Sequence, residues 1–213
     1  MKITFHAFLA VLVACVGAMG QAPFKLQLLH LSDMEAGLDA VKNAPAAAAI
    51  IDSLENMYPN TLKLAGGDNY IPSPFFNASS DAALRTPIQT ANKSIFKDLD
   101  STNSLRENYG RADMSFMHAI GFQASAIGNH EFDLGTAVFS DAIRVETNGR
   151  DIRWMGTQFP YLSSNLDFSG DASLAALYTK SIRPNTDYAT TPKTARSSSF
   201  ISKIAPATTI MVN

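Results

Sequence analysis

The chain has 213 residues, of which 46% are apolar and 17% are charged, and its formal net charge at pH 7 is −2. These values are typical of a globular protein with enough residues for one domain, so they exclude a chain that is disordered throughout. The charge balance lacks the basic excess of nucleic-acid-binding proteins, and we expect no nucleic-acid partner.

The first 20 residues have the pattern of a secretory signal peptide. Met1-Lys2 is followed by an apolar stretch that runs to Gly17, and Ala18-Met19-Gly20 is a small-x-small cleavage site. The stretch is too short for a membrane-spanning helix. Leu12-Val13-Ala14-Cys15 also fits a bacterial lipoprotein processing box, although the apolar residues after Cys15 favour ordinary cleavage. In either case the sequence predicts an exported protein, periplasmic or extracellular, that contacts a membrane only if Cys15 is lipidated.

Three short apolar segments predict β-strands, and each ends in acidic or amide side chains. Residues 24–31 lead to Asp33 and Glu35, residues 61–65 to Gly66-Gly67-Asp68-Asn69, and residues 121–127 to Gly128-Asn129-His130-Glu131. The stretches between the segments are long enough for crossover helices, and the carboxyl ends of parallel strands meet at the same edge of a sheet. We therefore expect Asp33, Glu35, Asp68 and Asn129 to converge there.

The side chains at these strand ends fit metal chemistry. Carboxylate and amide oxygens are hard ligands for a divalent cation, and His130 is followed three residues later by Asp133, which can orient its ring. The third segment taken alone also fits a polar turn after a strand, with His130 hydrogen-bonded locally.

The remaining residues predict scaffold. Residues 46–55 predict a helix with Pro45 near its start, residues 111–120 another with His118 on its surface, and residues 135–144 a third. Residues 69–108 are rich in Pro, Ser, Asn and Asp and predict a long loop. Its aromatic residues fit either the core or a substrate mouth, and burial tendencies favour the core. Residues 207–213 predict the start of a strand without a partner. The aromatic residues of the loop are Tyr70, Phe75 and Phe76.

The three strand-end motifs resemble those of a known family. Asp33-x-Glu35, residues 66–69 and Gly128-Asn129-His130-Glu131-Phe132-Asp133 are similar to the first three motifs of the calcineurin-like metallophosphoesterases, in particular of the 5′-nucleotidase branch. Residues 159–165 are similar to a strand of that branch. The resemblance spans about residues 26–213 and implies an α/β fold, a central β-sheet flanked by helices. The chain is then a signal peptide, residues 1–20, and an incomplete metallophosphoesterase domain, residues 24–213, truncated at its C-terminus.

The resemblance also implies a centre of two divalent metal ions, whose identity (Mn, Mg, Ca, Zn or Fe) stays open. Asp33 resembles the aspartate that binds one ion, Asp68 the aspartate that bridges both, and Asn129 the amide ligand of the second. Glu35 stands where the family usually has a histidine, and a carboxylate there favours Mg²⁺, Mn²⁺ or Ca²⁺ over softer metals.

His130 resembles the family's histidine that stabilises the phosphoryl transition state and the leaving group, and Asp133 resembles its orienting partner. The resemblance implies an exported hydrolase of phosphate monoesters, with nucleotides as candidate substrates and no predicted protein partner. The family takes further ligands from downstream histidines, including a Gly-His-x-His motif, but this chain has four histidines and none follows His130. The alternative is a truncated, non-catalytic remnant that binds a metal ion or phosphate weakly. A secreted binding or structural domain with coincidental motifs is a third reading.

Overall fold

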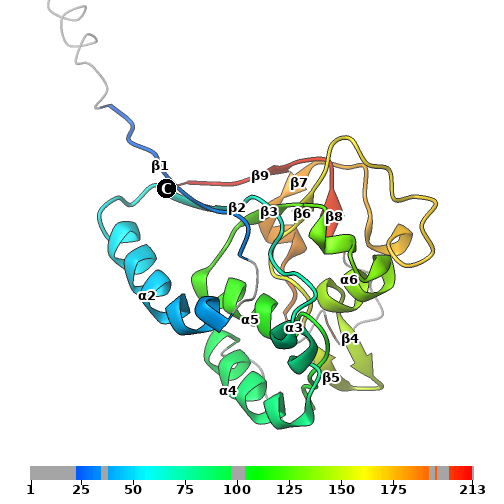
Figure 1. The fold of residues 1–213 in the computed structure, drawn as a ribbon. Helices are drawn as coiled ribbons and strands as arrows, with labels where there is room; N and C mark the ends of the chain where they lie inside the picture. Colours follow the sequence, from blue (N-terminus) through cyan, green and yellow to red (C-terminus); the bar gives the residue numbers. More distant parts are fainter. Residues whose placement is uncertain (1–22, 35–37, 97–103, 192–194, 196–201, 213) are drawn as a thin grey trace, which may run out of the picture.

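The computed structural model describes residues 23–34, 38–96, 104–191, 195 and 202–212 (Figure 1). The predicted signal peptide and Glu35 lie outside these ranges.

Five parallel strands form the central sheet, and their order in space is their order in the sequence. They are β1 (Gln27–Leu31), β2 (Thr61–Ala65), β3 (Ala124–Ala126), β6 (Tyr161–Leu162) and β8 (Ile204–Ala205). In the register of this sheet Leu31 pairs with Ala65, and Ala65 pairs with Ser125. The first three strands therefore reach the same edge of the sheet with their carboxyl ends, as their sequences predict.

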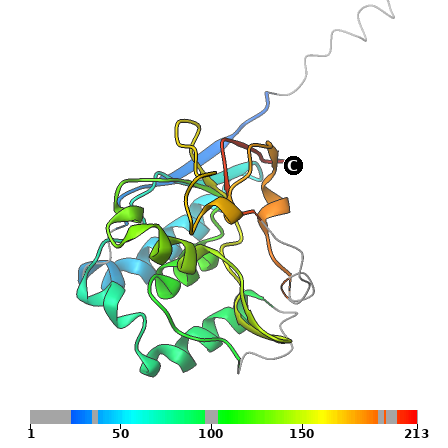
Figure 2. The same ribbon diagram turned by 90° about the vertical axis from the view of Figure 1, so that its right-hand side faces the viewer.

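The helices follow the strands as crossovers. A parallel sheet with its strands in sequential order receives all its helices on one face when every crossover has the usual right-handed sense. Figures 1 and 2 show α2, α4 and α5 on the same side of the sheet. An α/β fold with a mostly parallel sheet and packed helices is thus confirmed.

The helices are α2 (Leu38–Glu55), α3 (Pro74–Ala78), α4 (Arg85–Ile95), α5 (Arg111–Ile120) and α6 (Gly135–Ile143), with 3₁₀ turns η1 (Ala82–Leu84), η2 (His130–Phe132), η3 (Ala175–Leu177) and η4 (Asn185–Tyr188).

Two small sheets complete the described secondary structure. The strands β4 (Glu146–Asn148) and β5 (Asp151–Trp154) pair in antiparallel orientation. The strands β7 (Arg183–Pro184) and β9 (Thr208–Thr209) pair in parallel. The expectation that residues 207–213 lack a strand partner is therefore wrong, because β9 pairs with β7.

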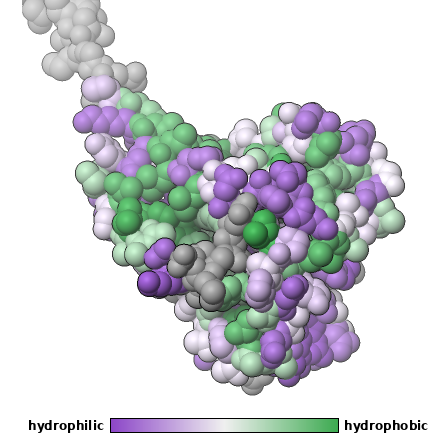
Figure 3. Space-filling model, in the orientation of Figure 1, coloured by the Kyte–Doolittle hydropathy of each residue, from purple (hydrophilic) through white to green (hydrophobic). Residues whose placement is uncertain are grey.

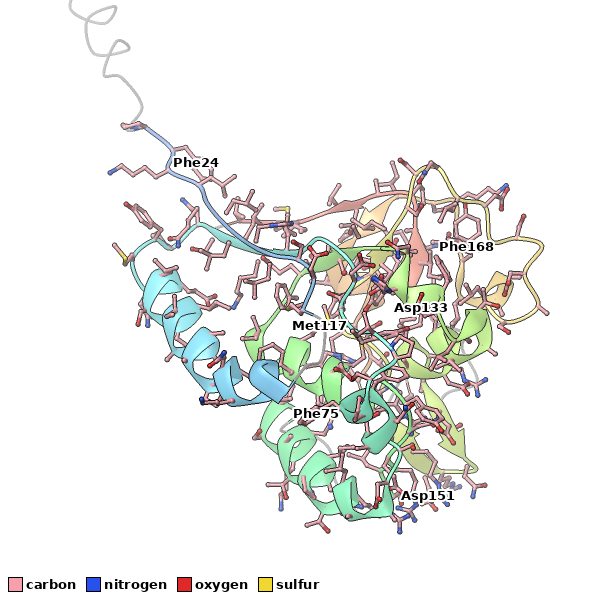
Figure 4. The ribbon with its side chains drawn as sticks, in the orientation of Figure 1. Phe24, Phe75, Met117, Asp133, Asp151 and Phe168 are labelled. Atoms are coloured by element: carbon pink, nitrogen blue, oxygen red, sulfur yellow. The ribbon has the colours of Figure 1, made fainter. Side chains whose placement is uncertain are left out.

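The main core lies between the sheet and the helices. Met117 on α5, Tyr161 on β6 and Ile204 on β8 are all buried there, and so is Trp154 on β5. Figure 4 shows Met117 between the sheet and the helical layer. Burial of these large apolar side chains is the main favourable contribution to folding.

The opposite face of the sheet is more open near β1. Side chains two residues apart on a strand share a face, and Leu26 and Leu28 are 51% and 57% exposed. Figure 3 shows apolar surface over β1, β2 and part of α2. None of the helices within the described ranges is long and apolar enough to cross a membrane.

Residues 69–108 do not form the expected long loop, since they contain α3 and α4. Their polar residues act as helix caps: Ser73 accepts a hydrogen bond from the Phe76 N–H at 3.1 Å, directly before Pro74 at the first helical position. Asp81 likewise accepts from Ala83 N at 2.8 Å before η1. The Pro, Ser and Asp content thus marks helix starts, because these residue types serve both in loops and in caps.

Two other expectations are settled by the same region. Tyr70 is 2% exposed and Phe76 is fully buried, and their rings stack with centroids 4.6 Å apart, so these aromatic residues belong to the core. Helix α2 begins earlier than predicted, at Leu38, so that Pro45 lies inside it instead of near its start. A proline inside a helix removes one backbone hydrogen bond, which a helix of 18 residues tolerates when its other turns remain bonded.

Candidate functional site

The loops after β1, β2 and β3 lie against one another at the carboxyl edge of the sheet. Gly66 N donates to Leu31 O at 2.7 Å, and Asp33 N donates to Gly67 O at 3.2 Å, which joins the first two loops. A Cβ atom on Gly67 would lie 2.6 Å from Gly128 N, so the second and third loops approach as closely as glycine permits.

Two of the predicted ligands have an unusual backbone conformation. Asp33 has φ = 53° and Asp68 has φ = 50°, and among the described residues they are the non-glycine residues with positive φ. The left-handed region is sparsely populated by residues with a side chain, and such residues cluster at functional sites. Both outliers are acidic, and both lie in loops that follow strands at the same edge of the sheet, Asp33 after β1 and Asp68 after β2.

The carboxylate of Asp68 connects the second loop to the third. Its Oδ1 accepts a hydrogen bond from His130 N at 2.9 Å. A Cβ atom on Gly128 would lie 2.1 Å from the same oxygen, so a glycine is required for the carboxylate to occupy this position. Asp68 therefore lies directly beside the segment that carries Asn129 and His130.

His130 and Asp133 form a pair. His130 Nδ1 lies 2.6 Å from Asp133 Oδ2, and the 3₁₀ turn η2 brings the two side chains to the same side of the chain. About a third of each side chain is exposed (34% each). Figure 4 shows Asp133 near the ends of the central strands, far from Asp151 of β5. The carboxylate stabilises a proton on Nδ1 and fixes the orientation of the ring.

A buried network below these residues was not predicted from the sequence. Glu131 is 1% exposed, and its carboxylate accepts hydrogen bonds from Gly128 N, Asp68 N and Asn69 N at 2.7, 3.1 and 2.8 Å. Burial raises the pKa of Glu131, and the three backbone donors act against that shift. Asn69 Nδ2 donates to Glu131 Oε1 at 3.1 Å and also to Tyr161 OH at 3.2 Å.

The structure thus places five of the six predicted site residues at one edge. Asp33, Asn129 and Asp133 are exposed there, and Asp68 and His130 are partly exposed. The sixth, Glu35, lies outside the described residues. Within those ranges no group of three or more His, Cys, Asp or Glu side chains is arranged to hold a metal ion. The oxygen donors of Asp33, Asp68 and Asn129 fit a hard divalent cation in their chemistry, while the described carboxylates and imidazoles alone do not complete a ligand cluster.

His118 does not belong to this site. The expectation that it lies on a helix surface is wrong, since it is 8% exposed and packs against Phe96, Trp154 and Phe159. Burial, together with a smaller effect of the Lys203 charge, lowers the pKa of His118 to about 3. His118 lies on the apolar face of α5, which packs against the core.

Comparison with known proteins gives distant relatives. The chain is 33% identical over 75 residues, 33% of this chain, to the trifunctional nucleotide phosphoesterase protein YfkN of Bacillus subtilis. It is 27% identical over 156 residues to the snake venom 5′-nucleotidase of Gloydius brevicauda and 26% identical over 170 residues to a 5′-nucleotidase of Diplobatis ommata, which cover 67% and 74% of this chain.

The chain is therefore distantly similar to 5′-nucleotidase and phosphoesterase proteins. It spans 5%, 20% and 23% of the length of these three relatives, in the same order. No family model and no solved structure matches the chain.

Proposed function

We propose that the chain is part of a metal-dependent hydrolase of phosphate monoesters, with nucleotides as the substrate class. The observation that carries the proposal is the placement of Asp68, whose carboxylate contacts the loop of Asn129 and His130 while its left-handed backbone sets it at the sheet edge beside Asp33. The names of the distant relatives support the choice of nucleotides. Export of the protein is part of the proposal and rests on the N-terminal pattern.

Asp33, Asp68 and Asn129, together with Glu35, are the proposed ligands. These oxygens would hold two divalent ions, which would supply an activated water and neutralise negative charge on a phosphoryl group. Asp68 follows the middle strand of the three. Its loop contacts that of Asp33 through the hydrogen bond from Asp33 N to Gly67 O, and its carboxylate contacts the loop of Asn129 and His130.

His130 acts on the departing oxygen in this proposal. With Nδ1 held by Asp133, the ring can carry a second proton on Nε2 and donate it, or a hydrogen bond, to an ester oxygen as its bond to phosphorus breaks. Asp133 positions the ring and stabilises its protonated form, which makes the pair suited to general acid chemistry.

Phosphate release tests the proposal directly. The purified chain is incubated with p-nitrophenyl phosphate and, separately, with a nucleoside 5′-monophosphate, in Mn²⁺ or in excess chelator. Phosphate release that requires Mn²⁺ and occurs with both substrates supports the proposal. Release from p-nitrophenyl phosphate alone leaves a phosphatase but removes nucleotides as its substrates.

Absence of release from folded protein would mean that the motifs persist in a chain that is not itself a phosphatase. Circular dichroism on the same sample shows whether the protein is folded. Mn²⁺ binding without turnover would then identify the non-catalytic metal-binding alternative.

A further inference from the structure

Glu131 lies in the loop after β3 and joins it to the loop after β2, and it is not among the residues proposed to bind metal or substrate. Its Oε2 accepts from Gly128 N and Asp68 N, and its Oε1 accepts from Asn69 N and Asn69 Nδ2. One donor comes from the loop after β3 and three come from the loop after β2. The four distances lie between 2.7 and 3.1 Å, and the side chain is 1% exposed.

An ionised carboxylate is suited to this place because it only accepts hydrogen bonds and offers about four lone-pair positions. The four N–H groups fill them. A buried N–H group without an acceptor is costly, so the carboxylate stabilises both loops in this conformation.

The left-handed conformation of Asp68 belongs to the same arrangement. Consecutive backbone N–H groups turn toward one side where a chain passes through the left-handed region, and they can then bind one anion. Here the N–H groups of Asp68 and Asn69 both reach Glu131, while the Asp68 side chain lies on the third loop and accepts from His130 N. The buried carboxylate thus offsets the strain of a backbone that directs Asp68 toward the site.

The peptide of Glu131 also takes part. Its carbonyl oxygen accepts from Tyr70 OH at 3.2 Å, so side chain and backbone of one residue bind the segment 68–70 at three successive positions. A displacement of η2 would move His130 and this segment together.

We propose that Glu131 is a positioning residue, which locks the loops after β2 and β3 together so that Asp68, Asn129 and His130 keep their relative geometry. The inference rests on the proposed function in so far as these three residues bind metal and act on substrate. Glu131 itself touches neither.

Glu131→Gln tests the proposal with almost no change in volume. The amide keeps one oxygen, and its NH₂ group faces two of the four N–H donors in either orientation. Loss of a partner that orients metal ligands typically lowers metal affinity by about 10- to 100-fold. We expect a fall of this size in Mn²⁺ affinity, measured by electron paramagnetic resonance of free Mn²⁺, and faster hydrogen exchange at the amides of Gly128, Asp68 and Asn69.

Glu146→Gln is the matched control. Glu146 also binds buried N–H groups, through its ion pair with Arg111, but it lies on β4 outside the site. The Glu146→Gln substitution is expected to lower the melting temperature. Mn²⁺ affinity and hydrogen exchange at the amides of Gly128, Asp68 and Asn69 should stay unchanged. Equal losses of Mn²⁺ affinity in the two variants would overturn the proposal, because general destabilisation would then explain them.

Asn69→Ala provides a milder variant if Glu131→Gln does not fold. It removes one of the four hydrogen bonds and keeps the three backbone donors, so a smaller loss of Mn²⁺ affinity is expected, and an unchanged affinity counts against the proposal.

If the wild-type chain binds no Mn²⁺, the proposed function fails. The role of Glu131 is then still tested by hydrogen exchange at the amides of Gly128, Asp68 and Asn69. Faster exchange at all three amides supports the lock, and unchanged exchange overturns it.

Discussion

Two buried charged side chains, Glu131 and Lys203, lie at opposite edges of the central sheet. Glu131 is 1% exposed and follows β3, at the carboxyl edge, where it accepts from backbone N–H groups. Lys203 is fully buried and directly precedes β8, at the amino edge, where it donates to Thr157 O, to Tyr188 O at 2.7 Å and to Thr190 Oγ1 at 3.0 Å.

Both groups have their hydrogen bonds satisfied inside the protein, so burial of a charge does not by itself distinguish a functional site from a structural one. The difference lies in their surroundings. Around Glu131 the loops carry exposed acidic and amide side chains with a left-handed backbone, while around Lys203 the partners are carbonyl and hydroxyl groups of the scaffold. In parallel sheets ligands bind at the carboxyl edge, which is the edge of the proposed site.

The largest effect is expected from substitution of His130, and His118 in the core serves as the comparison. His130→Ala should lower kcat by about 10²- to 10⁴-fold, the usual contribution of general acid–base catalysis, with little change in Mn²⁺ affinity. His118→Phe, which replaces a core ring packed against Phe159, should change stability and leave kcat per folded molecule intact. Steady-state kinetics with p-nitrophenyl phosphate separates the two, and parallel losses of Mn²⁺ binding and kcat in His130→Ala would show instead that His130 is a ligand.

Asp68→Asn should lower Mn²⁺ affinity by about 100-fold or more, beyond what loss of an outer partner typically costs. The amide keeps an oxygen that can accept from His130 N, so the loop is expected to stay in place. Asp167→Asn is the matched control, because Asp167 is an exposed carboxylate that binds Lys180 away from the site. Affinity is measured by titration calorimetry, and equal affinities in both variants would remove Asp68 from the ligand set.

Gly128→Ala should lower Mn²⁺ affinity about 10-fold, the lower end of the range for displaced ligands. Its Cβ would lie 2.1 Å from Asp68 Oδ1, so the carboxylate has to move. Gly170→Ala makes the same change where a Cβ meets no atom within 4 Å, and its effect on stability is expected to stay within about 0.5 kcal/mol. An unchanged affinity in Gly128→Ala would mean that the position of this carboxylate is unimportant for binding.

The smallest effect is a pH dependence at the amino edge. Burial lowers the pKa of Lys203 to about 7 from its ordinary value of 10.5. Between these values the unfolded chain binds more protons than the folded protein, so the free energy of unfolding rises with pH, by at most about 1.4 kcal/mol per pH unit. Urea unfolding of the wild type between pH 7 and 9 should show this slope, and Lys203→Met should lack it. Identical slopes in the two proteins would show that Lys203 does not titrate in this window.

The strand ends could be predicted from the sequence because three apolar segments each lead into acidic or amide residues, and parallel pairing then determines where they meet. The role of Glu131 could not be predicted from the sequence. Its backbone donors are the N–H groups of Gly128 and of two residues about 60 positions earlier, and no side-chain pattern marks them. The only sequence signal is a third consecutive polar residue in the segment 128–131, between the proposed catalytic His130 and Phe132, which packs against the core.

The same limit explains the other differences. Residues 69–108 have a loop-like composition because the residues that cap helices are also those of turns, and the partner of β9 lies in a polar segment without strand periodicity. Buried charges such as Lys203 are invisible in the sequence, since only the fold supplies the three acceptors that make the burial possible.

Paramagnetic broadening by Mn²⁺ tests the central claim, a metal site at the carboxyl edge of the sheet, most directly. Mn²⁺ is added in substoichiometric steps to ¹⁵N-labelled protein, and the amide signals are followed residue by residue. The signals of Asp33, Asp68 and Asn129 are expected to disappear first, while those around Lys203 persist. First loss of signals at the amino edge, or uniform broadening throughout the protein, would contradict it.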